Sequence, residues 1–492
     1  MASASSRATR DIVLLFVTRT LRLAAYGTIG VVLALFLNAA GLSDREIGLL
    51  LFLTLIGDSA VSLFVTRHAD AARRAWLASS CLLMAGAGLA FGLAPRPSFG
   101  LLLAAATLGV ISPSGNEVGP FLSLEQSILS ELVSPETRTH VFAWYNLVGY
   151  SATALGSLGV GHALVWARQA YGISDLDGYR AVFVQYAGCG LVLLGLFLLL
   201  TDRVERPERR RKPPPSAPVP AELLHNADAE AGLTAPLLQP TPPDPTAATS
   251  EHEPEQPSAS DPSPKPATTP DPVTVPATSP STASTNPAAP SAAPAPPSAL
   301  GLSPRSHRIV SHLALLCSLD SLAGGLVTGT LLAYFFSVRY GVSTAYLGGL
   351  LFGANMLAAV SSLASGFVAA RFGLVNTMVF THLPSNVLML LVPLMPNLTA
   401  ATAMVFARYS ISQMDVAPRS AYIAGVVRPE ERTAAMGVVN IAKSVGAAFG
   451  PLITGWLAQQ GLFDWAFYGC GGGKIVYDLL LLWSFSHIKP EH

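Results

Sequence analysis

The residues of this sequence that could do chemistry are acids and bases within long apolar segments. If the first segment is helical, Arg19 and Arg22 share one face of it, with Tyr26 one turn further along. A charge in the hydrocarbon of a bilayer costs roughly 3 kcal/mol or more, so these side chains must face protein or water. An acid close to an arginine can also release and rebind a proton when its surroundings change. The pattern therefore predicts a polar site inside a membrane.

The other candidate residues lie in three further apolar segments. They are Asn116, Glu117, Glu125 and Gln126 in 99–132, Asp320 in 308–337, and Arg408, Gln413, Asp415 and Arg419 in 398–427. In one continuous helix, Arg408, Asp415 and Arg419 would share a face. Together with the three residues of the first segment, they are the candidate residues of this polar site.

Structural roles are the alternative for several of these residues. Asp415 and Arg419 stand in the favourable order for an i,i+4 ion pair. The two arginines of the first segment have the alternative role of balancing Asp320 or Glu117 across the interface between helix bundles. Each of these roles needs no substrate.

Exchange of a proton requires a carboxyl group whose surroundings change. Burial disfavours the charged carboxylate, whereas a nearby cation favours it. Glu117, Glu125 and Asp320 are the candidates. We interpret Lys474 and Asp478, in 462–485, as a structural i,i+4 pair.

The segment from Ile111 to Pro120 contains two prolines and two glycines at membrane depth. Each proline removes one intrahelical hydrogen bond. A broken helix is tolerated where its free backbone groups face protein or water, and such breaks often mark binding sites. This segment, which carries Asn116 and Glu117, is therefore the best indication of a binding site. The alternative is a packing kink in which Asn116 satisfies the freed carbonyl groups.

Composition indicates that the apolar segments cross a membrane. Of the 492 residues, 51% are hydrophobic and 12% are charged, against about 25% charged in soluble proteins. About 20 helical residues cross the hydrocarbon core. The predicted spans are 12–38, 46–66, 75–94, 99–132, 139–166, 179–201, 308–337, 344–370, 374–395, 398–427, 431–459 and 462–485. The expected fold is an all-α polytopic membrane protein with twelve spans.

The segment 202–306 differs from the rest because it is rich in Pro, Ala, Ser and Thr. It has too few large apolar residues to form a core, so we predict a disordered cytoplasmic linker. The linker is a tether or, alternatively, a site of regulatory phosphorylation. The other parts are the N-terminal segment 1–11, the bundles 12–201 and 307–485, and the tail 486–492. Lys and Arg are more frequent on the linker side, so both termini are expected to be cytoplasmic.

The two bundles repeat one another in sequence. At a separation of 300 residues, Gly41, Ser43, Gly48, Leu50, Leu51 and Phe52 match Gly341, Ser343, Gly348, Leu350, Leu351 and Phe352. At a separation of 294 residues, Asn146, Ala154, Gly156 and Gly161 match Asn440, Ala448, Gly450 and Gly455. Repeats in the same orientation predict two six-helix bundles related by pseudo-two-fold symmetry.

The loop between the second and third spans carries a family motif. It reads Thr66-Arg67-His68-Ala69-Asp70-Ala71-Ala72-Arg73-Arg74, and its repeat ends in Ala370-Arg371-Phe372-Gly373. With the span count and the duplication, this loop makes the chain resemble the major facilitator superfamily, whose loop reads Gly-x-x-x-Asp-Arg-x-Gly-Arg-Arg. The matching residues are Asp70, Arg73 and Arg74 in the first copy and Arg371 and Gly373 in the second. In the second copy, Ala370 replaces the acid.

The resemblance implies roles for these residues and for the spans. In the family, this loop helps to latch the bundles in one access state. Asp58 of the second span is expected either to be the structural partner of a loop arginine or to be a proton site. The first, fourth, seventh and tenth spans line the central cavity in the family, and these spans hold most of the charges found here.

The function implied by the resemblance is secondary active transport of a small solute by alternating access, coupled to protons or as a facilitator. The alternative is a transporter-like receptor or scaffold that signals through the linker. Enzyme activity is not expected, since the run from Gly471 to Ile475 lacks the spacing and the Ser or Thr of a phosphate-binding loop.

The expected partners are the lipid bilayer, a small-molecule substrate and protons. No cofactor, metal or nucleic acid is expected, because the formal net charge is zero and no metal-ligand spacing is present. We expect a monomer in the plasma membrane, with an organelle membrane as the alternative.

If Glu117 carries the coupling proton, the substitution Glu117→Gln removes the pH dependence of uptake, because an amide cannot titrate. Uptake by vesicles across a range of pH measures this. Uptake that keeps its full pH dependence in Glu117→Gln would remove Glu117 from the candidates.

Overall fold

The computed structural model describes residues 2–68, 72–95, 98–109, 111, 120–204, 303–428 and 431–485. These residues belong to one compact unit, formed by Met1–Glu208 with Ala295–His492. Most of the predicted linker 202–306, the tail 486–492 and the site residues Asp70, Asn116 and Glu117 lie outside the described residues.

The first half of the chain forms six helical spans. They are α1 (Ala2–Ala39), α2 (Asp44–His68), α3 (Arg73–Leu93), α4 (Phe99–Leu108) with α5 (Pro120–Leu132), α6 (Pro135–Tyr171) and α7 (Asp175–Leu198), followed by the 3₁₀ turn η2 (Asp202–Val204). α1 begins well before the predicted span 12–38, because no proline or glycine interrupts its first residues. α4 ends before the Pro- and Gly-rich segment in which the sequence predicts a break, and α5 begins at the last residue of that segment, Pro120.

The second half repeats this arrangement. Its helices are α9 (Pro304–Leu326) with α10 (Gly329–Tyr340), α11 (Thr344–Phe372), α12 (Leu374–Leu391) with the 3₁₀ turn η3 (Val392–Leu394), α13 (Leu398–Tyr409) with α14 (Val416–Gly425), α15 (Arg432–Gln459) and α16 (Asp464–Phe485). In the described residues, eight stretches are each long and apolar enough to cross a bilayer. With the broken and more polar spans, the chain is the predicted twelve-span, all-α membrane protein.

Local sequence fixes where several helices begin and end. The side chains of Ser98, Ser174 and Ser343 each accept a hydrogen bond from a backbone N–H in the first turn that follows. Gly172 and Gly341 end α6 and α10 in the left-handed conformation that favours glycine. These short connections force successive spans to run antiparallel.

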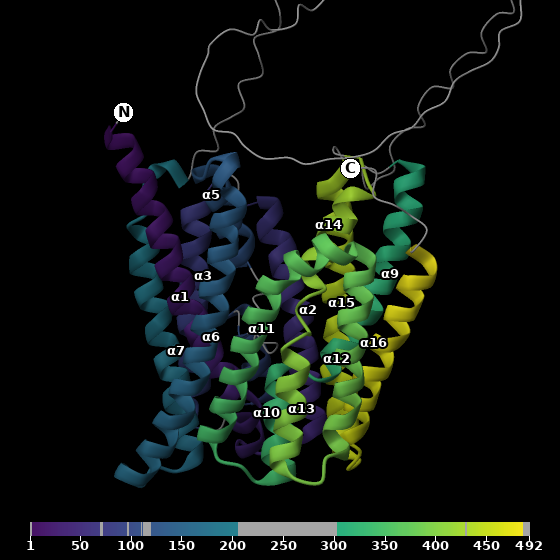
Figure 1. The fold of residues 1–492 in the computed structure, drawn as a ribbon. Coiled ribbons are helices and arrows are strands. Elements are labelled where there is room, and N and C mark those ends of the chain that lie inside the picture. The colour runs from purple at the N-terminus through teal and green to yellow at the C-terminus, as the bar shows by residue number, and fades with distance from the viewer. Residues whose placement is uncertain are drawn as a thin grey trace, which may run out of the picture. The chain divides into compact units, whose positions relative to one another are not determined.

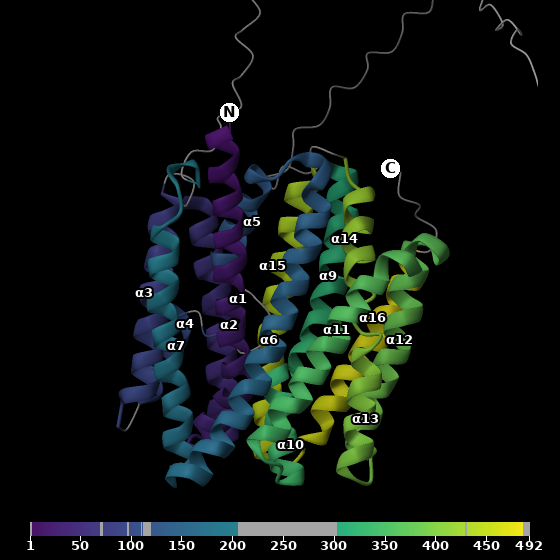
Figure 2. The ribbon, with the colours of Figure 1, turned by 60° about the vertical axis from the view of Figure 1, so that its left-hand side comes forward.

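Equivalent spans pack in equivalent pairs in the two halves. α1 packs along α6 and α3 along α7, while α9 packs along α15 and α12 along α16. Figures 1 and 2 show the start of α1, the end of α14 and the start of α9 at one end of the bundle. We call this the linker end, because Val204 and Ser303 lie there. The opposite end, with the connections from α1 to α2 and from α10 to α11, is the far end.

The tenth span consists of two helices because of Pro418. Proline lacks the N–H that would bond the carbonyl of Met414, four residues earlier. Instead, the hydroxyl of Ser365 on α11 donates to the carbonyl of Met414 at 2.8 Å, and Ser361 accepts from the backbone N–H of Gln413 at 3.2 Å. The neighbouring helix thus satisfies backbone groups that the break frees inside the membrane.

The prediction that Arg408, Asp415 and Arg419 share one helical face is therefore wrong. α13 ends and α14 begins between Arg408 and Arg419, so the two arginines belong to different helices. The predicted span 308–337 also divides, at Val327 and Thr328, between α9 and α10.

Two pairs of glycines bring the halves into backbone contact near the far end. Gly48 of α2 lies against Gly455 of α15, and Gly161 of α6 lies against Gly348 of α11. A Cβ atom on any of the four would meet backbone atoms of the other half. Gly48 matches Gly348 in the repeat, and Gly161 matches Gly455, so the pseudo-two-fold axis exchanges the two contacts.

Polar contacts also join the halves at the far end. The side-chain amide of Asn38 donates to the hydroxyl of Tyr334 at 3.0 Å, and that hydroxyl donates to Asp44 at 2.6 Å. The hydroxyl of Thr344 donates to the carbonyl of Gly161 at 3.4 Å. The far end is therefore closed by direct contacts between α1, α2 and α6 of one half and α10, α11 and α15 of the other.

Gly348→Ala is expected to weaken the closed far end by about 1–3 kcal/mol, because its methyl group would press on the backbone of α6. The adjacent Gly349→Ala is the matched control, since a Cβ there meets no atom within 4 Å. Thermal unfolding and spin-label distances across the far end measure the effect. Equal behaviour of the two variants would contradict a tight glycine contact.

Candidate functional site

In the first half, Arg22 of α1 and Glu125 of α5 form a fully buried ion pair. The two terminal guanidinium nitrogens donate to the two carboxylate oxygens at 2.5 and 2.6 Å, and neither side chain is exposed. The hydroxyl of Tyr145 on α6 also donates to Glu125. The guanidinium of Arg22 lies 4.7 Å from the ring centroid of Phe121. This bidentate geometry offsets part of the desolvation cost and ties three spans together.

Arg19, one turn earlier on α1, binds the same tyrosine. Its Nε donates to the carbonyl of Tyr145 at 2.8 Å, and its guanidinium lies 4.0 Å from the centroid of the ring. Arg19 and Arg22 thus point to the same side of α1, toward partners in their own half. We call Arg19, Arg22, Glu125 and Tyr145 the N-terminal charge cluster.

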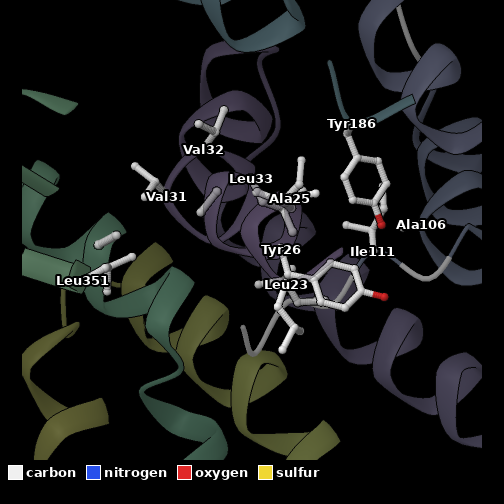
Figure 3. Packing of buried hydrophobic residues seen from close by; sticks show 14 of the residues in the cluster. Leu23, Ala25, Tyr26, Val31, Val32, Leu33, Ala106, Ile111, Tyr186 and Leu351 are labelled. Atoms are coloured by element: carbon white, nitrogen blue, oxygen red, sulfur yellow. The ribbon is translucent and has the colours of Figure 1, made fainter. Parts of the chain in front are cut away.

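Tyr26, the next predicted residue on α1, packs against α7. Its ring stacks on Tyr186 with 6.4 Å between centroids. Figure 3 shows both tyrosines beside Ala106 and Ile111 in the buried apolar core. Tyr26 is 1% exposed, so in this conformation a solute cannot reach its ring.

Asp58 of α2 is fully buried, and neither of its carboxylate oxygens has a hydrogen-bond partner among the described residues. The loop arginines bind other acids: Arg73 donates to Glu131 at 2.8 Å, and Arg74 donates to Asp202 at 2.9 Å. Both roles of Asp58, as the structural partner of a loop arginine or as a proton site, stay predictions, because the side chain of Arg67 lies outside the described residues.

The rest of the predicted conformational loop is divided between the two repeats. Arg73 and Arg74 fix the start of α3 to the ends of α5 and α7, respectively. In the second repeat, Arg371 is exposed at the end of α11. Gly373 follows with a φ of 82°, a conformation that favours glycine.

In the second half, Asp320 of α9 binds two cations. Its Oδ2 accepts from Arg419 of α14 at 2.9 Å, and its Oδ1 accepts from Lys474 of α16 at 2.5 Å. Arg419 also donates to Asp415, which directly precedes α14. All four side chains are buried. We call Asp320, Asp415, Arg419 and Lys474 the C-terminal charge cluster.

The predicted i,i+4 pair of Lys474 and Asp478 does not form, because each residue binds another helix. Lys474 binds Asp320, whereas Asp478 accepts from the amide of Asn386 at 2.9 Å and lies 2.8 Å from Nδ1 of His382. His382 and Asn386 of α12 were not among the predicted site residues. Their spacing of four residues on one face of an apolar span was the signal that could have found them.

The other predicted cavity residues lie outside the two clusters. The guanidinium of Arg408 lies 4.9 Å from the ring centroid of Tyr409, and its Nε is buried without a hydrogen-bond partner in the described parts of the chain. Gln126 and Gln413 are half-buried. The predicted constellation therefore divides into one charge cluster in each half.

A cavity of about 400 Å³ lies at the far end between the two halves. Leu35, Leu164, Asp175, Tyr179, Ser343 and Leu347 are among its lining residues. The members of the two charge clusters do not line this cavity. Among the residues that the structure describes, no three His, Cys, Asp or Glu side chains are grouped to hold a metal ion.

Arg22→Met is expected to lower the free energy of unfolding by about 3–5 kcal/mol, because it leaves the charge of Glu125 buried and unpaired. The double variant Arg22→Met/Glu125→Met should recover most of this loss. Breaking the exposed Arg168–Asp175 pair with Asp175→Asn should cost less than about 1 kcal/mol. Unfolding in detergent measures all three, and a single variant as stable as the double variant would contradict the buried pair.

Comparison with known proteins places this fold in a family. A family model described as Major Facilitator Superfamily matches residues 15–414 and 313–492. The "Uncharacterized membrane protein YJR124C" of Saccharomyces cerevisiae is 30% identical over 488 residues, which cover 98% of this chain and 96% of that protein.

Solved structures of transporters have the same fold. The nucleoside transporter NupG has a TM-score of 0.61 at 11% identity, covering 97% of this chain and 99% of that chain. A bacterial homolog of the human lysosomal transporter Spinster, inward-facing and unoccupied, has a TM-score of 0.58 at 16% identity, covering 98% and 96%. The inward-open xylose transporter XylE from E. coli has a TM-score of 0.57 at 12% identity, covering 98% and 96%. From the family match, the relative and the fold together, this chain belongs to the Major Facilitator Superfamily of membrane transporters.

Proposed function

We propose that this protein is a secondary active transporter that moves a small solute by alternating access, coupled to protons. The observation that carries the proposal is the pair of glycine contacts that the pseudo-two-fold axis exchanges. Both contacts lie near the far end, and each joins one half to the other. Breaking both, while each half stays intact, would open the far end by a rocking motion.

Each half has the internal bonds that such a motion requires. Arg22 and Glu125 tie α1 to α5 in the first half, and Asp320 ties α9 to α14 and α16 in the second. Because a buried ion pair is costly to break, the halves should move as rigid bodies. Similar solved structures described as inward-facing or inward-open support the assignment of this conformation to a state closed on the outer side. In this proposal the linker end and both termini are cytoplasmic.

Glu125 is the acid that best fits the role of the coupling group. Its carboxylate binds Arg22 and Tyr145 together, on spans that meet at the centre of the first half. When Glu125 is protonated, it no longer balances the charge of Arg22, which then becomes free to bind an anionic or polar group of a solute. When Glu125 loses its proton, it recaptures Arg22 and releases the solute. Glu117 and Asp320 stay as further candidates.

The remaining candidate residues are assigned to the solute path. Arg19 belongs to the N-terminal charge cluster, and Gln126 directly follows its member Glu125 in sequence. Arg408 lies just before the break of the tenth span, and Gln413 lies within the break. The unpartnered Nε of Arg408 is a donor that a solute could satisfy. The proposed protein acts as a monomer in the plasma membrane or an organelle membrane.

The test begins with a thermal-shift screen of the purified protein against metabolites, followed by flux of the hits in reconstituted vesicles. We expect a proton gradient to drive accumulation of the solute. Glu125→Gln should abolish this accumulation while solute exchange without a gradient continues, because the amide cannot carry a proton. A protein that binds a hit but moves none of it would instead fit the receptor or scaffold alternative.

Closing the far end permanently provides a second test of alternating access. Arg45 and Gln459 face one another across the halves, with the backbone nitrogen of Arg45 3.5 Å from the side-chain oxygen of Gln459. A short thiol cross-linker between Arg45→Cys and Gln459→Cys should stop flux, and each single variant is the control. Undiminished flux after complete cross-linking would contradict alternating access.

A further inference from the structure

His382 lies between two acids in the interior of the second half. It lies on α12, is 5% exposed, and its Nδ1 is 2.8 Å from Oδ1 of Asp478 on α16. Its Nε2 is 3.9 Å from Oδ1 of Asp320 on α9. The amide of Asn386 donates to the other oxygen of Asp478 at 2.9 Å and so holds that carboxylate in place.

The hydrogen bond to Asp478 decides which nitrogen of His382 is free. A neutral imidazole has one N–H, and a carboxylate can only accept, so the 2.8 Å contact with Asp478 favours the tautomer with its proton on Nδ1, with the amide of Asn386 donating to Asp478 rather than to the ring. Nε2 then presents a lone pair to the negatively charged oxygen of Asp320. Two acceptors that face one another repel, and a proton placed on Nε2 turns this repulsion into an ion pair.

The charged and titratable groups that act on His382 are Asp320 on α9 and Lys474, Tyr477 and Asp478 on α16. Asp320 in turn binds Lys474 and Arg419 of α14, and Arg419 binds Asp415. Lys443 on α15 lies within electrostatic range of Arg419 and Asp320. Histidine is the side chain that ordinarily titrates between pH 5 and 8. His382 is therefore the group of this set on which the proposal rests.

We propose that Nε2 of His382 and Oδ1 of Asp320 form a proton-binding site, for which Asp478 is the positioning residue. The site holds a proton on Nε2 in one state and none in the other, while the proton on Nδ1 is shared with Asp478 throughout. It lies on spans seven and nine, with Asp478 on span twelve, rather than on the spans that hold the N-terminal charge cluster. This inference rests on the proposed function, to which it adds a second proton.

Binding of the proton would loosen the hold of Asp320 on α14. Oδ1 of Asp320 already binds Lys474, and Oδ2 binds Arg419. An imidazolium beside Oδ1 competes with both cations for the same carboxylate. Since Arg419 directly follows Pro418 in the first turn of α14, a weaker bond frees α14 to pivot on the turn that Ser365 stabilises. The proton would thus change the conformation at the linker end.

The experiment measures proton binding and conformation in the full chain, without any solute. The ring nitrogens of isotopically labelled histidine report protonation by NMR, and subtraction of His382→Asn isolates the signal of His382. Asparagine keeps a donor to Asp478 but has no counterpart of Nε2. Spin labels on the exposed, repeat-equivalent positions Ser134 and Arg428 report opening at the linker end, in a background free of the native cysteines.

We expect one titration step of His382 between pH 5 and 8, which is lost in His382→Asn. The same variant should also lose the pH-dependent change in the distance between the two spin labels. Asp478→Asn should shift the midpoint of that step, and His162→Asn, at an exposed site in the first half, should leave it unchanged. No titration of His382, or the same distance change in His382→Asn, would overturn the proposal. If His382→Asn fails to fold, the midpoint in Asp478→Asn decides, and an unshifted midpoint overturns it.

The outcome is separable from the proposed transport. Loss of gradient-driven accumulation in Glu125→Gln tests the first proton and needs no titration of His382. Titration of His382 with a change in conformation tests the second proton and needs no solute flux. Either result can fail while the other stands.

Discussion

Lipid cannot solvate an ion, and this constraint shapes the arrangement of helices in both halves. A charged side chain on a span must face polar groups of the protein or water, and an opposite charge on another span satisfies it best. Arg22 and Glu125 meet this requirement between α1 and α5, and Asp320 meets it with Arg419 and Lys474. The ion pairs therefore specify which helices are neighbours, and they do so within each half rather than between halves.

The interface between the halves has a different chemistry. Small residues let the backbones of α2 and α15, and of α6 and α11, approach closely, and a few polar contacts close the far end. Separating such contacts costs little free energy, because no buried charge is exposed when they part. The molecule thus combines two internally bonded halves with a weakly bonded interface, which is the physical requirement for movement of one half against the other.

The sequence predicts the large-scale fold well, because hydrophobic length and internal duplication are properties of long segments. Twelve spans and the matched glycines follow from these patterns alone. Pairing of individual charges was harder to predict, because it depends on how helices rotate against each other. Lys474 and Asp478 looked like partners along one helix, yet each binds a different neighbour. The break of the tenth span was missed although Pro418 was visible, because its effect depends on Ser365 of another helix.

In the proposed transport cycle the halves move as rigid bodies about the glycine contacts, so one end opens as the other closes. Tyr171 and Trp465 occupy repeat-equivalent, exposed positions near the far end, and spin labels on them measure its opening by pulsed electron resonance. A second pair of spin labels reports the distance at the linker end. We expect that conditions which lengthen the label-to-label distance at one end shorten it at the other. If both distances change in the same direction, or a distance within one half changes as much, the rigid-body account is contradicted.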